Sequence, residues 1–204
     1  IAGVWALWRL GRWPASGRGE VETASGPVEC RVSAGVADLV VEFLSAGNGV
    51  RAVEDPSGDL LAAPADALGL RPDGLAIVNA GAAPPKTILH LPEPMLLDRI
   101  EADAGRVAGA CDRLGSTGLY PVAPHRDRPG LFEARQFPSR AGFLEDAATG
   151  VAAAGLAAVL AALGALPPDG RFAVLQGRAM GRPSRIEVTA PRTLPPARSW
   201  SAEG

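Results

Sequence analysis

The stretch LEDAATGVAAAGLAAVLAALGALPPDG, from Leu144 to Gly170, decides the fold of this 204-residue chain. It carries no charge between Ala147 and Pro168, and it consists mostly of Ala, Gly, Leu and Val. A run of about 20 uncharged residues could cross a bilayer. However, Ala contributes little to membrane insertion, and Asp146 and Asp169 stand where basic or aromatic anchors are expected. We therefore predict no membrane span, but a buried helix over 147–166.

This helix must be enclosed by other parts of the chain, since a helix that is apolar on every side is surrounded by protein. Ala and Gly allow a neighbouring backbone to come close, so the simplest packing partner is a sheet that curls around the helix. The rest of the chain supplies β-rich runs bounded by Gly, Pro and Asp. These runs cover residues 19–25, 27–35, 38–44, 74–81, 86–91, 118–124, 130–137, 171–177 and 184–190. The first two alternate apolar and polar residues around a Ser-Gly-Pro turn, which predicts a hairpin.

Further helices are few. We predict a short apolar helix over 1–10, an amphipathic helix over 95–115, and a weaker helical pattern over 55–70 that Pro64 interrupts. Together the patterns predict a mixed α+β fold with two sets of strands, each accompanied by one apolar helix of small residues. The predicted parts are the remainder of an N-terminal domain over 1–45, a connection over 46–75, a C-terminal domain over 76–190 and a tail over 191–204.

The composition narrows the class of protein. With 47% hydrophobic and 21% charged residues and a net charge of −2, the chain has the composition of a soluble globular protein. A slightly acidic chain does not attract phosphates, so nucleic acid is not an expected partner. Two cysteines, Cys30 and Cys111, cannot build a disulfide framework, and no Cys/His cluster predicts a metal site. We expect a cytoplasmic protein without a bound metal.

Two ordered motifs carry a resemblance to a known family. The segment ARQFPSRAGFLEDAATG, over 134–150, and the segment LQGRAMGRPSRIEV, over 175–188, resemble the C-terminal motifs of the PhzF-like phenazine-biosynthesis family, with the same order and spacing. The segment VNAGAAPPKTILHL, over 78–91, resembles the strand that opens the second domain of that family. The likeness extends back to Ile1 and therefore covers nearly the whole chain.

The resemblance implies a fold and a reaction. The fold is diaminopimelate-epimerase-like, with two curled sheets, each wrapped around a central helix, of which the first is incomplete here. The active site of such proteins lies between the domains, at the N-termini of the central helices. The implied reaction is a biosynthetic isomerisation, a proton shift in a small carboxylate-bearing metabolite that needs no cofactor. The resemblance also implies a homodimer.

Elementary physics supports a carboxylate site at the start of the predicted helix. Backbone N–H groups in the first turn have no partner within the helix and carry the positive end of its dipole. We therefore predict that Ala148, Thr149, Gly150 and Val151 bind the substrate. The resemblance gives Asp146 a supporting catalytic role, in orienting the substrate or relaying a proton. The alternative is that Asp146 only caps the helix.

Neighbouring motif residues have simpler explanations. We expect Glu145 to be a solvated or structural partner of Asp146. Arg135, Phe137 and Arg182 are expected to serve as scaffold.

The chain also departs from the family pattern. Val151 stands where the family usually has a Ser hydroxyl, and Ala147 replaces a Pro. The main catalytic base of the family is a Glu in a segment that precedes a Gly-His-Pro-Thr motif, and this chain has neither. Because general acid/base catalysis requires that base, we expect this chain to be inactive in isolation.

Other reactive residues give weaker signals. We expect Cys30 to lie in a strand and Cys111 on the core face of a helix, both as inert packing residues. The segment AGNGVRAV, over 46–53, resembles an epimerase loop but has Ala46 in place of its Cys, which favours a turn after a strand. His90 and His125 have no nucleophile at a telling spacing, so a hydrolase is not supported.

Three functions remain open at this stage. The first is a PhzF-like isomerase that lacks its N-terminal segment. The second is a non-catalytic short relative that binds a small molecule or a partner. The third is an epimerase or racemase on the same fold. The identity of the substrate stays open in all three.

Overall fold

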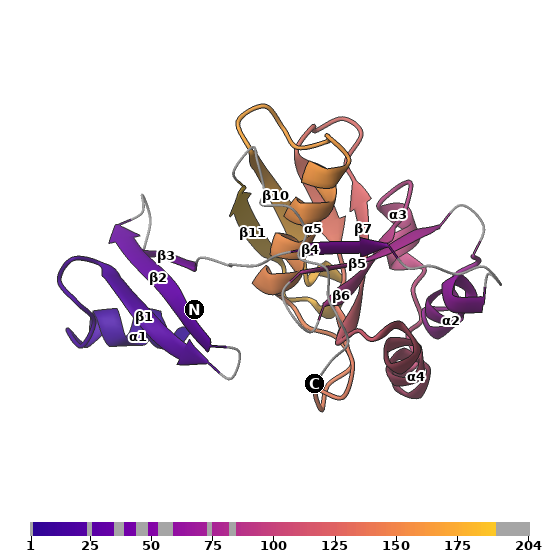
Figure 1. The fold of residues 1–204 in the computed structure, drawn as a ribbon, viewed down its shortest axis with the longest axis horizontal. Helices are drawn as coiled ribbons and strands as arrows, with labels where there is room; N and C mark the ends of the chain where they lie inside the picture. The colour runs from indigo at the N-terminus through magenta and orange to yellow at the C-terminus, as the bar shows by residue number, and fades with distance from the viewer. Residues whose placement is uncertain are drawn as a thin grey trace. The chain divides into compact units, whose positions relative to one another are not determined.

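The structure is a computed structural model that describes residues 2–23, 26–34, 39–43, 49–52, 59–72, 75–81 and 85–190. The chain divides into two compact units, Ile1–Ala46 and Gly47–Gly204. Both contain helices and strands, which confirms the mixed α+β class (Figure 1). The predicted tail over 191–204 lies outside the described residues.

The first unit is a small sheet with one helix. Helix α1 (Ala2–Arg9) is followed by the strands β1 (Arg18–Thr23), β2 (Gly26–Ala34) and β3 (Leu39–Phe43), which form an antiparallel sheet in the order β1-β2-β3. The predicted hairpin of β1 and β2 is therefore confirmed. Its core consists of Val4, Cys30 and Val32, with Trp8 and Trp13 packed against them.

The second unit is built on one large sheet. Its strands are β4 (Gly49–Ala52), β5 (Ala76–Gly81), β6 (Lys86–His90), β7 (Gly118–Pro124), β8 (Leu131–Ala134), β9 (Phe137–Pro138), β10 (Arg171–Gln176) and β11 (Ser184–Thr189). The strand order is β11-β10-β8-β7-β6-β5-β4, and β9 pairs with β7. β6 and β7 are parallel, as are β8 and β10, while the other pairs are antiparallel.

Helix α5 (Gly150–Ala162) lies inside the curl of this sheet (Figure 1). It packs against β4 and β11, which end the strand order at opposite edges, so the sheet wraps around the helix. Gly155 permits the close approach, because a Cβ at that position would lie 3.1 Å from Ala80 O on β5. The prediction of a helix buried in a curled sheet is confirmed. None of the helices in the described ranges is long and apolar enough to span a bilayer.

The observed helix is shorter than the predicted span of 147–166. At its end, Gly164 adopts a left-handed conformation with φ of 65°, which stops the helix after Leu163. At its start, the backbone of Asp146 and Ala147 bonds to the sheet and not to a helix. The amide of Asp146 donates to Gln136 O, and Ala147 O accepts a hydrogen bond from Ser184 Oγ.

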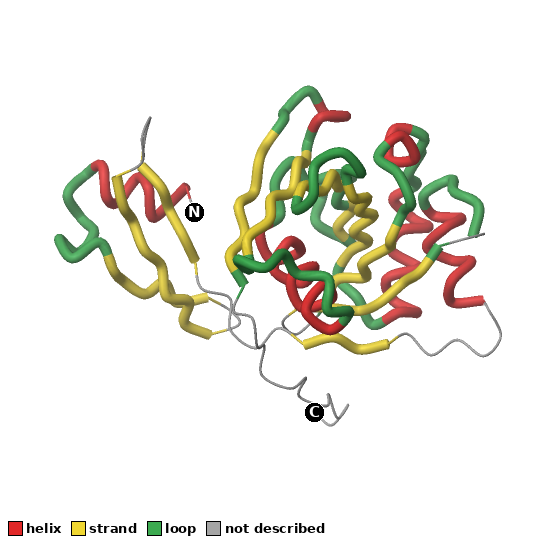
Figure 2. The backbone as a smooth tube through the Cα atoms, turned by 90° about the horizontal axis from the view of Figure 1, so that it is seen from above, coloured by secondary structure: helices red, strands yellow, loops and turns green. Residues whose placement is uncertain are grey.

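Three helices cover the opposite face of the sheet: α2 (Asp59–Ala67), α3 (Met95–Asp98) and α4 (Ala104–Leu114). Figure 2 shows them grouped together, with strands between them and α5. They enclose a second core whose members are Ala67, Leu68, Leu89, Leu91, Leu97, Ile100, Val107, Ala110, Cys111, Leu114, Leu119, Ala123 and Phe137. The helical pattern predicted over 55–70 is confirmed as α2, but Pro64 lies inside this helix and does not interrupt it.

Two local predictions were wrong. The single helix predicted over 95–115 is broken into α3 and α4, because Asp103 caps α4 through a 2.8 Å bond from the amide of Arg106. The amides of Glu101 and Asp103 also donate to carbonyls at the end of α2 and not to a continuous helix. Within 46–53, where a turn was predicted, residues 49–52 form the strand β4, which pairs with β5. Ala46 lies outside the described residues.

Candidate functional site

The N-terminus of α5 is not closed by its own cap residue. Thr149 occupies the N-cap position, but its side chain accepts no hydrogen bond from the helix. Instead, Thr149 Oγ1 donates to Asp146 Oδ2 at 2.7 Å. The other carboxylate oxygen of Asp146 accepts a long bond of 3.4 Å from the amide of Ala148. Asp146 therefore bonds to the segment before the helix and caps none of the first-turn amides.

Two amides of α5 remain available as a result. Across the described ranges, no group accepts a hydrogen bond from the N–H of Gly150 or Val151. Unpaired amides at a helix start combine with the helix dipole into an anion-binding feature. The Val151 side chain is 53% exposed, so its neighbouring amide lies near the surface. Asp146 and the four residues predicted to bind substrate, Ala148, Thr149, Gly150 and Val151, thus lie together at the start of α5, and their role as a site stays a prediction.

Gln176 organises the floor of the site and was missed as a site residue. Its Nε2 donates to Asp146 O at 2.7 Å and to Thr149 Oγ1 at 3.1 Å. Its Oε1 accepts from Tyr120 Oη and from the amide of Thr149, both at 3.4 Å. Gln176 is the second residue of the motif over 175–188, and this position was the sequence signal that could have identified it. Burial raises the pKa of Tyr120, so this side chain stays protonated and donates.

The rest of the second motif holds the EDAATG turn in place. Ser184 Oγ donates to Ala147 O at 2.7 Å. Gly177 adopts a φ of 80°, and a Cβ there would lie only 2.8 Å from Ala147 O. Glycine has no side chain to clash with the turn, so the backbone of Gly177 can lie directly against it. These motif residues act as a scaffold for Asp146.

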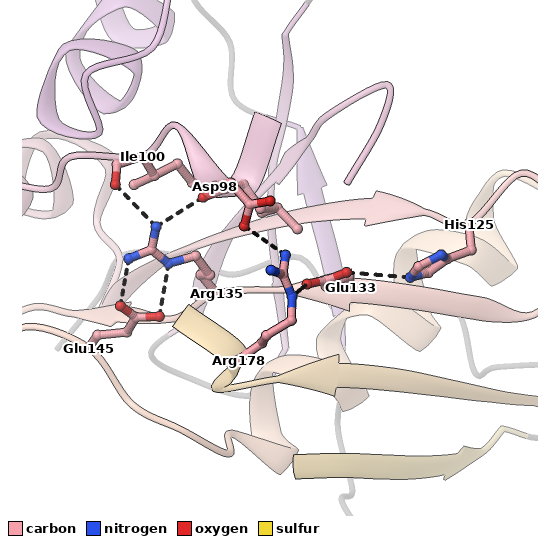
Figure 3. A network of polar contacts seen from close by, with 8 residues as sticks. Asp98, Ile100, His125, Glu133, Arg135, Glu145 and Arg178 are labelled. Atoms are coloured by element: carbon pink, nitrogen blue, oxygen red, sulfur yellow. Dashed lines mark hydrogen bonds and ion pairs between the residues drawn. The ribbon is translucent and has the colours of Figure 1, made fainter. Parts of the chain in front are cut away.

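Figure 3 shows two ionic groups beside this turn. Arg135 Nε and Nη2 bond to both oxygens of Glu145, at 2.9 and 2.7 Å, while its Nη1 donates to the carbonyls of Leu97 and Ile100. Glu145 is therefore a structural partner of Arg135 and not a solvated group. Arg135 serves as scaffold, as expected. This pair fixes the residue next to Asp146, since a bidentate contact restrains orientation as well as distance.

The second group links three elements at the same side of the sheet (Figure 3). Arg178, in the 3₁₀ helix η1 (Arg178–Met180), donates to Glu133 Oε1 and to Asp98 Oδ1, each at 2.7 Å. His125 Nε2 lies 3.5 Å from the other oxygen of Glu133, too far for a well-formed hydrogen bond. These contacts attach η1 and α3 to β8.

Lys86 was not among the predicted site residues. It is the first residue of β6, it is half-buried, and its Nζ donates to Thr117 O at 3.1 Å. Burial lowers the pKa of its ammonium, while the Asp146 carboxylate and, where ionised, the Cys111 thiolate act in the opposite direction. Asp146 therefore acts electrostatically on the Lys86 ammonium. No sequence signal marked this residue, because a single Lys at a strand start has many ordinary explanations.

The two cysteines are packing residues in the cores of their own units. Cys30 and Cys111 are both free and buried, as predicted. Burial raises the pKa of Cys111 to about 11, so its thiol is not ionised near neutral pH. The described residues include no group of three or more His, Cys, Asp or Glu side chains that could hold a metal ion.

Comparisons with known proteins identify the family of the chain. The model of the family described as phenazine biosynthesis-like protein matches residues 1–198. A curated relative from Deinococcus radiodurans, named an uncharacterized isomerase, is 34% identical over 191 residues, which cover 89% of this chain and 60% of that protein. The chain thus spans about three fifths of the length of this relative.

Solved structures show the same fold. A PhzF-family phenazine biosynthesis protein from Bacillus anthracis is similar with a TM-score of 0.73 and 17% identity, over 90% of this chain and 63% of the other. A predicted epimerase from Pseudomonas aeruginosa gives a TM-score of 0.71 and 24% identity, over 92% and 64%. A hydroxyproline epimerase from Agrobacterium vitis gives 0.55 and 15%, over 93% and 57%. The chain therefore belongs to the phenazine biosynthesis-like protein family and has a diaminopimelate-epimerase-like fold.

Proposed function

We propose that this chain provides the carboxylate-binding part of a PhzF-like isomerase that shifts a proton within a small metabolite. The observation that carries the proposal is the pair of unpaired amides of Gly150 and Val151 beside Asp146. The substrate carboxylate accepts hydrogen bonds from these amides and lies at the positive end of the α5 dipole. No cofactor takes part in this reaction.

Asp146 acts as the supporting proton carrier in this proposal. The hydroxyl of Thr149 donates to Oδ2, so that oxygen is already engaged, whereas Oδ1 has only the long bond from Ala148. Oδ1 is therefore the less engaged of the two oxygens and the one better placed to accept a proton. Gln176 and the Arg135–Glu145 pair hold the carboxylate in position through Asp146 O and the neighbouring residue. Such fixed geometry is what proton transfer requires.

The main catalytic base is proposed to come from outside these residues. The family resemblance assigns it to a Glu that precedes a Gly-His-Pro-Thr motif, and neither occurs in the sequence. We propose that the isolated chain binds the carboxylate without turning over the substrate. We also propose that it works in the cytoplasm, in biosynthesis and as a homodimer, on the support of the family resemblance.

An epimerase or racemase reaction is the second candidate. It uses the same carboxylate site, and two of the similar folds carry the name epimerase. However, a two-thiol epimerase needs ionisable thiols at the helix starts. Cys30 lies in the core of the first unit, and Cys111 lies near the C-terminal end of α4 on its buried face, so neither supports that mechanism. The isomerase is therefore the better supported reaction.

The experiment is a calorimetric titration of the 204-residue chain with two ligands of similar shape, benzoate and benzamide. If the unpaired amides form an anion site, benzoate binds at least about tenfold more tightly than benzamide, because hydrogen bonds to charged groups are the stronger ones. Equal affinities, or no binding of benzoate, would contradict the proposed function.

A further inference from the structure

The outer edge of β11 is open to another strand within the described part of the chain. β11 ends the strand order of the large sheet, and β10 pairs with its inner edge. The face of β11 that turns to α5 is covered, since Ile186 and Val188 pack against the core around that helix. The other face is exposed and carries Arg185 and Glu187. Unpaired backbone groups along such an edge are a template for pairing with another chain.

The backbone groups that point to this edge are those of Arg185 and Glu187. On the inner side, the amide of Ala190 donates to Gly170 O. Residues of an antiparallel pair alternate between bonded and non-bonded positions, so Ile186 bonds toward β10 as Ala190 does. The amides and carbonyls of Arg185 and Glu187 therefore point outward, where no described strand pairs with them.

The charges of these two residues select one register for a second copy of the chain. Two identical strands can pair antiparallel around a two-fold axis, which gives a closed and self-complementary interface. An axis at Ile186 puts Arg185 of each copy directly opposite Glu187 of the other, and opposite charges in such positions stabilise a sheet. An axis at Arg185 or at Glu187 would put like charges opposite each other, which destabilises the pairing.

Proline excludes the neighbouring registers. Pro183 and Pro191 flank β11 in the sequence, and proline has no backbone N–H to donate. An axis two residues from Ile186, in either direction, would set one of these prolines opposite Arg185. Only the axis at Ile186 gives each outward-pointing residue a partner with both an N–H and an opposite charge.

We propose that β11 is the surface through which two copies of this chain pair, antiparallel around a two-fold axis at Ile186. The amide of Arg185 donates to the carbonyl of Glu187 in the second copy, and the amide of that Glu187 donates back to the carbonyl of Arg185. Their side chains form an ion pair on the exposed face of the sheet. Charged residues on an edge strand usually hinder pairing, and here they hinder every register except this one. The inference rests on the homodimer of the proposed function and specifies its surface.

The test uses two charge variants of the 204-residue chain, Arg185→Glu and Glu187→Arg, in sedimentation equilibrium. Each variant sets like charges opposite each other in both symmetry-related pairs. The dissociation constant of its dimer should therefore rise at least about tenfold above that of the unmodified chain. Arg31→Glu is the matched control, because it reverses a charge in a similar exposed pair with Glu29 on β2, and it should change the constant by no more than about twofold.

An equimolar mixture of the two charge variants is the decisive sample. In a mixed dimer, opposite charges again face each other in both pairs, so the dissociation constant should return to within about threefold of the original value. Within each variant chain, residues 185 and 187 still carry like charges. A change in the fold of the single variants therefore cannot explain recovery in the mixture.

The other outcomes overturn the proposal in distinguishable ways. A dimer that neither charge variant weakens would show that another surface is used, and the homodimer of the proposed function would stand. A monomeric chain would overturn both the surface and the homodimer. A dimer that forms only after deletion of residues 191–204 would show that this segment occupies the edge instead. Carboxylate binding is measured separately by the benzoate titration and does not depend on any of these results.

Discussion

Thr149 Oγ1 lies 2.7 Å from Asp146 Oδ2 and donates a hydrogen bond to it, so the N-cap residue of α5 bonds to a carboxylate outside the helix. In an ordinary cap, the side-chain oxygen would accept a hydrogen bond from an amide of the first turn. Here the arrangement orients Asp146 and leaves two amides free. One contact thereby accounts for both parts of the proposed site.

The contact between Thr149 and Asp146 predicts a cost when the hydroxyl is removed. Thr149→Val keeps the shape of the buried side chain but leaves Asp146 Oδ2 and Gln176 Nε2 each with one bond fewer. We expect the free energy of unfolding to fall by about 1 to 3 kcal/mol in urea denaturation. Thr189→Val, on an exposed position of β11, should change it by no more than about 0.5 kcal/mol. Equal effects would show that the hydroxyl contributes nothing.

Two helix glycines should respond to alanine in opposite directions. In Gly109→Ala on α4, the new Cβ meets nothing within 4 Å, so better helix propensity should stabilise the protein by up to about 1 kcal/mol. In Gly155→Ala on α5, the Cβ lies 3.1 Å from Ala80 O, and the strain should destabilise it by about 1 to 3 kcal/mol. Thermal unfolding distinguishes the two. A stabilising Gly155→Ala would contradict the close contact of α5 with β5.

The buried ion pair next to Asp146 should be costly to break. Arg135→Met leaves the Glu145 carboxylate, which is 10% exposed, without its partner, and it also frees two backbone carbonyls. We expect a loss of about 3 to 5 kcal/mol in the free energy of unfolding. Arg185→Met removes an exposed pair with Glu187 and should cost no more than about 1 kcal/mol. A loss of that small size for Arg135→Met would mean that the pair does not anchor the turn.

Cys111 should make the stability depend on alkaline pH. Burial raises its pKa from 9.0 to about 11, so the unfolded chain releases this proton at lower pH than the folded protein does. Between pH 9 and 11, the unfolded state binds fewer protons, and the stability therefore falls as the pH rises, by up to about 2 kcal/mol. Below pH 9 the thiol contributes no slope. Denaturation of the protein and of Cys111→Ala at pH 8 and 10.5 should show a flatter dependence for the variant, and identical slopes would refute this assignment.

The fold was largely predictable because local patterns agree with the tertiary structure. Alternation and turn residues located β1 and β2, and the charge-free composition of α5 predicted a helix enclosed by a sheet. The break between α3 and α4 was not predictable from periodicity, since Ile100 and Val107 continue the apolar pattern across it. Asp103 is a typical N-cap residue and could have indicated the start of α4. The bonds from the amides of Glu101 and Asp103 to the end of α2 are long-range, and the local sequence does not indicate them.

The site was predictable only in part. The motif residues Asp146, Thr149 and Gly150 lie together as expected, because they are consecutive in sequence. Gln176 lies in β10 and Lys86 in β6, two strands that are not neighbours in the sheet, so only the assembled sheet brings both under the influence of Asp146. A polar residue in a strand predicts an exposed face more readily than a buried site, which is why these two were missed.

The central claim is that the free amides at the start of α5 bind a carboxylate, and one pair of variants at Gly150 tests it most directly. Gly150→Pro removes an N–H that no described group accepts, at the first helical position, where proline fits. Gly150→Ala adds a Cβ as well but keeps the N–H. We predict that benzoate binds to Gly150→Pro at least about tenfold more weakly than to Gly150→Ala, in a calorimetric titration. Equal affinities of the two variants for benzoate would contradict the account.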